Sequence, residues 1–510
     1  MSVSIFNHVL GPIMHGPSSS HTAASFHIGR VCRYILGENP VSVVCAFDKD
    51  GSYGEVFRQQ GSDKAFAVGM MGLEITDDLF YTALEEAEER GIHISFPVED
   101  LPVKDHPNVA DVRMKGQSGR EVTVCARSIG GGAVKFTHVN GFSTDFGGDT
   151  YEVMVFSTES PGKELPSPEG TYWKEEKCAE GYCFNQLSLL YPPEEKLLKV
   201  LKGMDKVNQV LVGEPVFFPK VGEPLFESGE EILNWCQENK ASLGEAAMEY
   251  EARLLGLSKE EVTKEMLRRY WVMEKAAEAG LAESIPPMKL LYPSARKVME
   301  AEKENRLAVG GLHTRAAARA MAVMHINGAK GLVCAAPTAG SAGTVPGVFV
   351  TMRQEMGLEG EDLARALFAA SAVGMVVAKR ATFAAEVAGC QVEIGVAGAM
   401  GAAGVAEYAG ATAEEALNAA AISLQNTMGS VCDLVQGFVE IPCHTRNAAA
   451  AANAFLCADL VMGGYDNPVP LDETIDAMYA VGKMMPPELR CTAKGGLAIC
   501  PSALAIPVQE

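Results

Sequence analysis

The sequence lacks the features typical of secreted and membrane proteins. Residues 1–22 contain no basic segment followed by an uninterrupted apolar run, so they do not indicate a signal peptide. The apolar stretch between Lys330 and Arg353 has no charged residue, but its prolines and many Gly, Ser and Thr residues make it a poor membrane span. We therefore expect a cytoplasmic protein.

Positive charge is also scarce. The chain has 43 Lys and Arg residues against 65 Asp and Glu residues, which gives a net charge of −22. This excess of negative charge disfavours nucleic acids and anionic membranes as partners. The chain is instead rich in apolar residues. Of its 510 residues, 47% are hydrophobic and only 21% are charged. Such a chain can bury a large core, and we expect more than one domain.

Three regions differ in composition. Residues 1–160 combine the strand patterns VSVVCAF and EVTVCARSI with turn sequences, which predicts a small α/β domain. Residues 161–269 are charged and interrupted by prolines, so we expect a linker and a helical insertion of unknown role. A Ser-x-x-Glu capping box at Ser258 predicts the start of an amphipathic helix. Residues 270–510 are rich in small residues and predict an all-helical domain, so the expected fold class is α+β.

The 13 cysteines include no CxxC pair, and neither a CxxC nor an HxxxH pair lies near Cys390, Cys432 or Cys443. In a reducing compartment, so many thiols argue against a disulfide framework and leave metal binding, catalysis or simple burial. Cys390, Cys432 and Cys443 fall within one region rich in small residues. Structural zinc usually takes close-spaced pairs, so three separated thiols suit an iron–sulfur cluster better. Burial as inert core residues remains the alternative.

Several motifs together resemble the iron–sulfur-dependent L-serine dehydratase family. In the C-terminal part they are APTAGSAGTVPG, GCQVEIG, VCDLVQGFVEIPCHTRNA and LRCTAKGGLAI, and in the N-terminal part GPSSSHT, GSDKA and SIGGG. The resemblance covers about residues 1–150 and 270–500. These two parts resemble the beta and alpha chains of that family, fused here in one chain.

The resemblance implies a lyase that deaminates L-serine to pyruvate and ammonia by dehydration, without pyridoxal phosphate. It also implies a [4Fe–4S] cluster held by Cys390, Cys432 and Cys443, with one iron left open as a Lewis acid. In single-chain relatives a C-terminal cysteine can cover that iron, so Cys500 is a candidate fourth ligand, with an ordinary thiol as the alternative. A small amino-acid substrate and a homodimer are further expectations.

Polar residues of these motifs form the candidate substrate site. The serines of GPSSSHT offer donors for a carboxylate, although Ser and Thr also cap helices, and both roles can hold at once. His21 is a candidate acid or base, and the resemblance adds Lys64 as a second catalytic candidate. The candidate substrate-binding residues are Ser18, Ser19, Ser20, Thr22, Asp63, Arg446 and Asn447.

One position departs from the family pattern. The stretch RQQGSDKA aligns with a family segment that usually carries a histidine, a candidate base, where this chain has Gln60. A glutamine amide cannot accept an α-proton at neutral pH, so we expect His21, ahead of Lys64, to take that role. Alternatively, the substrate is another β-substituted amino or hydroxy acid, such as cysteine or threonine. A third hypothesis is a cluster-bearing binding protein without turnover.

Overall fold

The structure is a computed structural model, and it describes residues 2–509 except residues 104, 161–164, 167, 169 and 180. The chain forms two compact units. The helical unit consists of Met1–Ser19 and Gly222–Glu510, and the sheet unit of Ser20–Val221. None of the described helices combines the length and the apolar character needed to cross a membrane.

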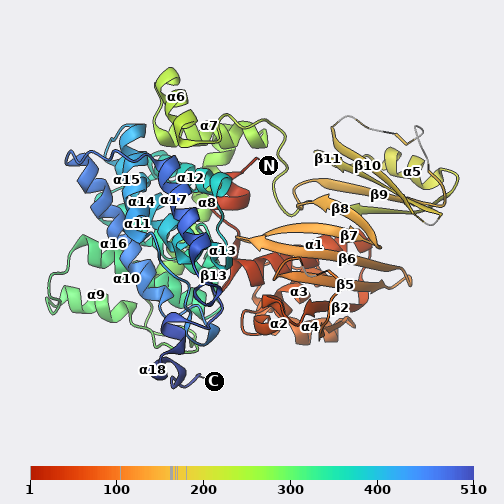
Figure 1. The fold of residues 1–510 in the computed structure, drawn as a ribbon, viewed down its shortest axis with the longest axis horizontal. Coiled ribbons are helices and arrows are strands. Elements are labelled where there is room, and N and C mark those ends of the chain that lie inside the picture. Colours follow the sequence, from red (N-terminus) through yellow and green to blue (C-terminus); the bar gives the residue numbers. More distant parts are fainter. Residues whose placement is uncertain are drawn as a thin grey trace. The chain divides into compact units, whose positions relative to one another are not determined.

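The sheet unit contains two sheets (Figure 1). The first has the strand order β3-β2-β5-β6-β7-β8, with β4 also paired to β2, and the second has the order β10-β11-β9-β12. The strands are β2 (Pro40–Asp48), β3 (His93–Ser95), β4 (Val98–Glu99), β5 (Val109–Gly116), β6 (Glu121–Gly130), β7 (Ala133–Val139), β8 (Phe142–Phe146), β9 (Tyr151–Ser157), β10 (Thr171–Ala179), β11 (Tyr182–Leu189) and β12 (Val207–Gly213). The helices are α1 (Ala24–Leu36), α2 (Ser52–Val56), α3 (Ser62–Met71), α4 (Ala83–Glu89) and α5 (Glu195–Gly203).

Side-chain alternation explains the first sheet. In β6 the side chains of Val122, Val124 and Ala126 are buried, while the residues between them face outward. Both strand patterns recognised in the sequence are strands of this sheet, β2 and β6. Helices α1 and α3 pack closely, because a Cβ added at Gly69 would lie 2.6 Å from the carbonyl oxygen of Phe26.

One disulfide joins β10 and β11. Cys178 and Cys183 lie directly opposite each other in the antiparallel register and are bonded to each other. The sequence argument against a disulfide framework did not anticipate this pair. Sequence alone could not reveal it, because the pairing depends on a hairpin register that only the fold fixes.

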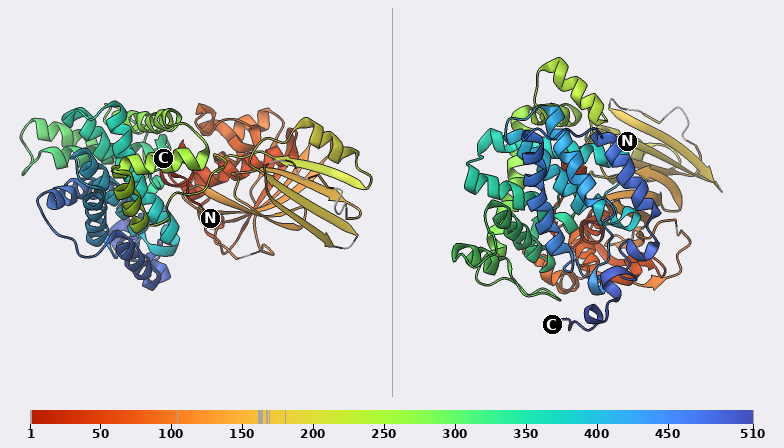
Figure 2. Two further views of the ribbon diagram at one scale, coloured as in Figure 1. Left: turned by 90° about the horizontal axis from the view of Figure 1, so that it is seen from above. Right: turned by 60° about the vertical axis from the view of Figure 1, so that its left-hand side comes forward.

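The helical unit is a bundle, which Figure 2 shows from two further sides. It begins with η1 (Ile5–Val9) and β1 (Ile13–His15). Its helices are α6 (Gly229–Asn239), α7 (Leu243–Leu255), α8 (Lys259–Gly280), α9 (Ala295–Lys303), α10 (Leu312–Gly328), α11 (Thr344–Met356), α12 (Gly360–Arg380), α13 (Ala385–Ala388), α14 (Ile394–Tyr408), α15 (Ala413–Thr427), α16 (Cys443–Met462), α17 (Leu471–Met484) and α18 (Pro501–Leu504). Together with the sheet unit, this confirms the predicted α+β class.

Helix α14 lies at the centre of this bundle. It contacts α11, α12, α15 and α16, and nearly all of its residues are buried. Its glycines permit this packing, since a Cβ at Gly401 would lie 3.0 Å from the Cβ of Ala454. The predicted capping box is also confirmed, because Ser258 and Glu261 exchange hydrogen bonds at the start of α8.

The two units divide the chain between Ser19 and Ser20 and between Val221 and Gly222. Residues 161–164, at the start of the expected linker, lie outside the described residues, but β10, β11 and β12 continue the sheet of β9. The next helices, α6 to α8, belong to the bundle. In addition, β1 pairs with the three-residue strand β13 (Leu332–Cys334), so the segment expected to be all-helical contains a strand.

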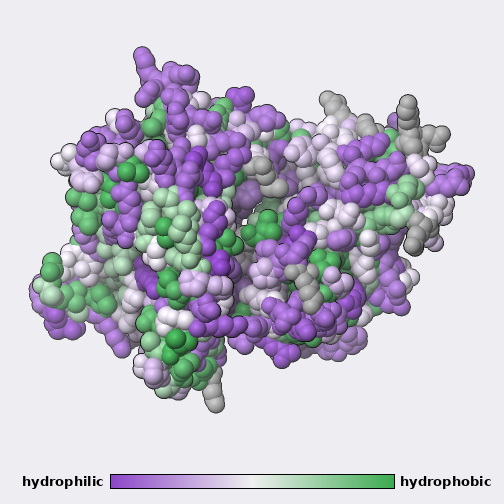
Figure 3. All heavy atoms as spheres, in the orientation of Figure 1, coloured by the Kyte–Doolittle hydropathy of each residue, from purple (hydrophilic) through white to green (hydrophobic). Residues whose placement is uncertain are grey.

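Apolar side chains are exposed near the C-terminus. Leu497, Ile499 and Leu504 are between 42% and 63% exposed. Figure 3 shows hydrophobic surface at the lower end of the molecule, where Figure 1 places α18.

Candidate functional site

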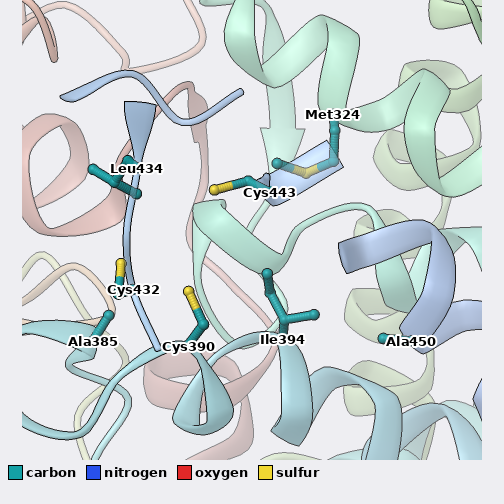
Figure 4. Packing of buried hydrophobic residues seen from close by; sticks show 8 residues of the cluster. All are labelled: Met324, Ala385, Cys390, Ile394, Cys432, Leu434, Cys443 and Ala450. Carbon is teal, nitrogen blue, oxygen red and sulfur yellow. The ribbon is translucent and has the colours of Figure 1, made fainter. Parts of the chain in front are cut away.

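Three buried cysteines from separate parts of the helical unit converge on one apolar space. Cys390 begins η6 (Cys390–Val392), Cys443 begins α16, and Cys432 lies in the segment before η7 (Val435–Gly437). All three belong to one hydrophobic cluster, and none is more than 3% exposed. Figure 4 shows their sulfur atoms facing a common space among apolar side chains. The structure therefore brings together the three cysteines that the sequence analysis grouped.

The residues on either side of Cys390 fix its position. Gly389 has a φ of +77°, and a Cβ there would lie 2.7 Å from the carbonyl oxygen of Ser430. Gln391 accepts a hydrogen bond from the backbone N–H of Gly429 at 2.8 Å. The motif GCQ is thereby tied to the segment that leads into Cys432.

The neighbour of Cys432 is held by the C-terminal segment. The carboxylate of Asp433 accepts a hydrogen bond from the backbone N–H of Leu497 at 2.9 Å and lies 3.0 Å from the guanidinium of Arg446. Gly496 makes this approach possible, since a Cβ there would lie 2.5 Å from the Asp433 carboxylate. These contacts explain why a glycine-rich sequence occurs so late in the chain.

The side-chain amide of Asn447 links two segments of the helical unit. Its Oδ1 atom accepts hydrogen bonds from the backbone N–H groups of Gly343 and Thr344 at 3.2 and 3.0 Å. Its Nδ2 group donates to the carbonyl oxygens of Gly340 and Cys443, both at 2.9 Å. The Asn447 amide therefore fastens the GSAGT segment to the first turn of α16.

The charges around the thiols favour ionisation of one cysteine and oppose ionisation of the others. A hydrogen bond from Cys432 and the guanidinium of Arg446 lower the pKa of Cys390. The same hydrogen bond raises the pKa of Cys432, and burial near Cys390 raises the pKa of Cys443. Burial beside Cys390 also raises the pKa of Glu393. Three thiolates here would repel one another, so the arrangement suits a cationic centre that binds all three.

A pair of neutral histidines supports the start of α16. The Nε2 atom of His325 accepts hydrogen bonds from the backbone N–H groups of Ser294 and Ala295 at 3.1 and 3.2 Å. Its Nδ1 atom therefore carries the proton and donates to Nδ1 of His444 at 3.1 Å. Burial lowers the pKa of His325 to about 4 and that of His444 to about 3, so both are neutral at pH 7.

The donor set fits a thiolate-bound cluster better than a single metal ion. Within the described part of the chain, one group of three His, Cys, Asp or Glu side chains has potential ligand atoms that all lie within 4.8 Å of one another. This group consists of Glu176, Cys178 and Cys183. Two of these are consumed by the disulfide. The sulfurs of Cys390, Cys432 and Cys443 are more widely spread, whereas tetrahedral zinc with bonds of about 2.3 Å draws its ligands close together.

Two N-terminal motifs meet in the sheet unit. The hydroxyl of Thr22 donates to the carbonyl oxygen of Gln60 at 2.7 Å, and that of Ser62 donates to the carbonyl oxygen of His21 at 2.8 Å. The Nε2 atom of His21 lies 3.1 Å from the hydroxyl of Ser52. Burial lowers the pKa of His21 to about 4. GPSSSHT and GSDKA, distant in sequence, are therefore neighbours.

The serine run spans the boundary of the two units. Ser18 and Ser19 belong to the helical unit and Ser20 to the sheet unit. Just before them, the carbonyl oxygen of Pro17 accepts a hydrogen bond from Asn327 of α10 at 3.2 Å. The loop is therefore anchored on its N-terminal side to the bundle.

The other two candidates of the sheet unit make contacts near their own helix. Asp63 accepts a hydrogen bond from the backbone N–H of Lys64 at 2.9 Å at the start of α3. The ammonium group of Lys64 donates to the carbonyl oxygen of Tyr81.

The sequence left Cys491 among the other cysteine candidates, together with Cys334, Cys457 and Cys500, and could not rank them. In the structure, Cys491 packs against the hydrophobic cluster that contains Cys390, Cys432 and Cys443. Cys500, the candidate fourth ligand, packs instead against a different cluster. The position of Cys491 within the motif LRCTAKGGLAI was the available signal.

Comparisons with known proteins identify the family of this chain. The family model of the serine dehydratase alpha chain matches residues 230–498. The probable L-serine dehydratase alpha chain of Bacillus subtilis is 37% identical over 278 residues, which are 54% of this chain and 93% of the relative. The L-serine dehydratase alpha chain of Peptoniphilus asaccharolyticus is 34% identical over 54% of this chain and 94% of its own. L-serine dehydratase 1 of Escherichia coli is 33% identical over 58% and 64%, respectively. The chain therefore belongs to the L-serine dehydratase family and is an enzyme of the lyase class.

Proposed function

We propose that this lyase deaminates L-serine to pyruvate and ammonia by dehydration, with a [4Fe–4S] cluster held by Cys390, Cys432 and Cys443. The observation that carries the proposal is the convergence of three buried thiols on one apolar space. These thiols lie in the part of the chain that the family model matches. Soft thiolate ligands without histidine are typical of iron–sulfur sites. When bound, such a cluster supplies an iron that acts as a Lewis acid on the substrate hydroxyl group.

Arg446 and Asn447 have different roles in this proposal. A guanidinium has five N–H donors, and Arg446 uses some of them on Asp433 and on the carbonyl oxygen of Val431. Its interaction with Cys390 supports a role for its remaining donors in binding the substrate carboxylate. We assign Asn447 as a positioning residue, because its amide bonds hold two segments of the protein.

In the sheet unit, His21 is our proposed base. Its pKa of about 4 keeps the imidazole neutral at pH 7, so it can accept a proton. An anionic substrate nearby would raise that pKa toward the working pH. Lys64 is the second candidate, but its ammonium group already donates to a carbonyl oxygen. Ser18, Ser19, Ser20, Thr22 and Asp63 remain proposed substrate-binding residues.

Gln60 supports an alternative substrate. It is 6% exposed and stands where the family usually carries a histidine, and its backbone carbonyl is bonded to Thr22. A different β-substituted amino or hydroxy acid, or binding without turnover, would account for this change.

The role of the N-terminal residues, the cellular location and the oligomeric state are also proposals. The family model matches residues 230–498, and the alpha-chain relatives match about half of this chain. We infer that the N-terminal residues supply the equivalent of a beta chain, and that the protein acts as a cytoplasmic homodimer.

The test is product formation by anaerobically purified protein. L-Serine, L-threonine and L-cysteine are each incubated with wild type, His21→Ala, Gln60→His and, as a control, His93→Ala, an exposed histidine of β3. We expect wild type to form pyruvate and ammonia from L-serine, and His21→Ala to lose about 100-fold or more at matched iron content. Full activity of His21→Ala would exclude it as the base. Serine turnover created only by Gln60→His would overturn L-serine as the substrate.

A further inference from the structure

A fourth cysteine lies at the three-thiol site. Cys491 packs against the cluster formed around Cys390, Cys432 and Cys443, and its thiol interacts electrostatically with that of Cys432. It also interacts electrostatically with Cys390. Four thiols from four separate segments therefore meet in one place, although Cys491 lies 48 residues or more from the others in the sequence.

The backbone fixes Cys491 at this place. The N–H of Cys432 donates to the carbonyl oxygen of Leu489 at 2.8 Å, and the N–H of Cys491 donates to the carbonyl oxygen of Cys432 at 2.9 Å. Cys432 and Arg490 thereby form a parallel bridge. The segment that carries Cys491 runs alongside one of the three cysteines in defined register.

The conformation of Cys491 argues that its side chain is used. Its φ is +63°, in the left-handed region that L-residues other than Asn and Asp seldom adopt. Glycine would occupy this conformation without strain. Unfavourable backbone conformations persist where the surrounding structure enforces them, and they gather at functional sites. Here the chain places a thiol, rather than a glycine, at a strained position beside three other thiols.

Cys500 lacks these properties. It packs with Leu290, Val435 and Ala503, and its sulfur lies 3.9 Å from the carbonyl oxygen of Gly496. Its own backbone, with φ at −66°, is unstrained.

We propose that Cys491 is a fourth thiolate ligand of the cluster. The inference rests on the proposed [4Fe–4S] cluster at Cys390, Cys432 and Cys443. With four thiolates, no iron is open in the resting protein, so a substrate has to displace one of them. Cys491 is the displaceable ligand, because it lies in a loop and is more exposed than the other three.

Oxidation distinguishes clusters with three and with four thiolate ligands. A cluster with one iron not held by protein loses that iron when oxidised, as [4Fe–4S]²⁺ becomes [3Fe–4S]⁺ with release of Fe²⁺ and one electron. Ferricyanide accepts the electron. The released iron is measured with a chelator, and the product is measured by its electron paramagnetic resonance signal, so neither readout depends on activity.

The variants are Cys491→Gly, which suits a φ of +63°, and Cys491→Ala. Cys457→Ala is the matched control, because Cys457 is a buried cysteine of α16 whose neighbour is Asn426. Thermal melting of each variant monitors folding. All proteins are reconstituted with iron and sulfide without oxygen and treated with one equivalent of ferricyanide.

We expect wild type and Cys457→Ala to keep all irons, and both Cys491 variants to release one iron per cluster and to show the [3Fe–4S]⁺ signal. Addition of L-serine to wild type should make its cluster lose iron as the variants do. If wild type and Cys491→Gly both carry intact clusters and release equal amounts of iron, Cys491 is not a ligand. That result would leave the proposed cluster itself in place. Absence of iron and sulfide from wild type would overturn the cluster itself, and the Cys491 inference with it.

Discussion

Burial controls the protonation of several single residues in this protein. His27 is 4% exposed and its Nδ1 atom bonds to the carbonyl oxygen of Gly132 at 2.9 Å. Burial lowers its pKa to about 4, as it does for His21 and His325. The energetic cost of charging such a residue is absent in the unfolded chain, where the histidine is free to bind a proton near pH 6.5.

This difference makes stability depend on pH. Between pH 6.5 and 4 the unfolded state binds more protons than the folded state. The free energy of unfolding is therefore highest, with respect to this histidine, above pH 6.5, and it decreases as the pH falls toward 4. At pH 5 the loss from one such histidine is about 2 kcal/mol. We predict that His27→Asn, which retains a donor for the carbonyl oxygen, loses less free energy of unfolding than wild type between pH 7 and pH 5.

Denaturant unfolding at the two pH values measures this quantity. The exposed His93, replaced by Asn, is the control and should leave the pH dependence of wild type unchanged. The same pH dependence in His27→Asn and wild type would contradict the assignment.

At the scale of elements, close approaches between segments bring the cysteines together. The turn between α13 and η6 passes so near Ser430 that the residue before Cys390 has no room for a side chain. Asn447 fastens another loop to α16, and Asp433 is held by the C-terminal segment. The position of each thiol therefore depends on a turn that is held by contacts with a segment distant in the sequence.

Gly389 tests this view against a matched glycine. Gly389 and Gly410 have φ values of +77° and +83°, but a Cβ meets a carbonyl oxygen at 2.7 Å at Gly389 and nothing within 4 Å at Gly410. We predict that Gly410→Ala costs about 1 kcal/mol of stability and keeps its iron, while Gly389→Ala displaces Cys390 and lowers the iron content. Iron analysis and thermal melting measure both effects. Equal iron content in the two variants would show that the contact at Gly389 does not position Cys390.

Local patterns in the sequence predicted individual helices and strands. They could not predict contacts between segments that lie far apart in the sequence. Strand β6 and the start of α8 follow from side-chain alternation and a capping box, which act over a few residues. Cys491 could not be distinguished from the other candidate cysteines, because its neighbours in space lie far away in the sequence and its backbone bonds are visible only in the fold. For the same reason, Cys178 and Cys183 could not be recognised as a pair.

At the scale of the whole molecule, one chain combines two units of different construction. The helical unit holds the thiols and the residues that the family model matches, and the sheet unit holds His21 and Lys64. The unit boundary falls within the serine run GPSSSHT, so one motif contributes to both units. The proposed cluster belongs entirely to the helical unit, so metal binding can be measured independently of the residues proposed for proton transfer.

The most direct test of the proposed function is the iron and acid-labile sulfide content of the whole chain, purified without oxygen. We predict about four irons and four sulfides per chain, with the brown colour of a thiolate-bound cluster. Cys390→Ala, Cys432→Ala and Cys443→Ala should each lose the cluster, whereas replacement of the buried Cys32 or Cys236 by Ala should leave it intact. Stoichiometric zinc without sulfide in the wild-type protein would contradict the account.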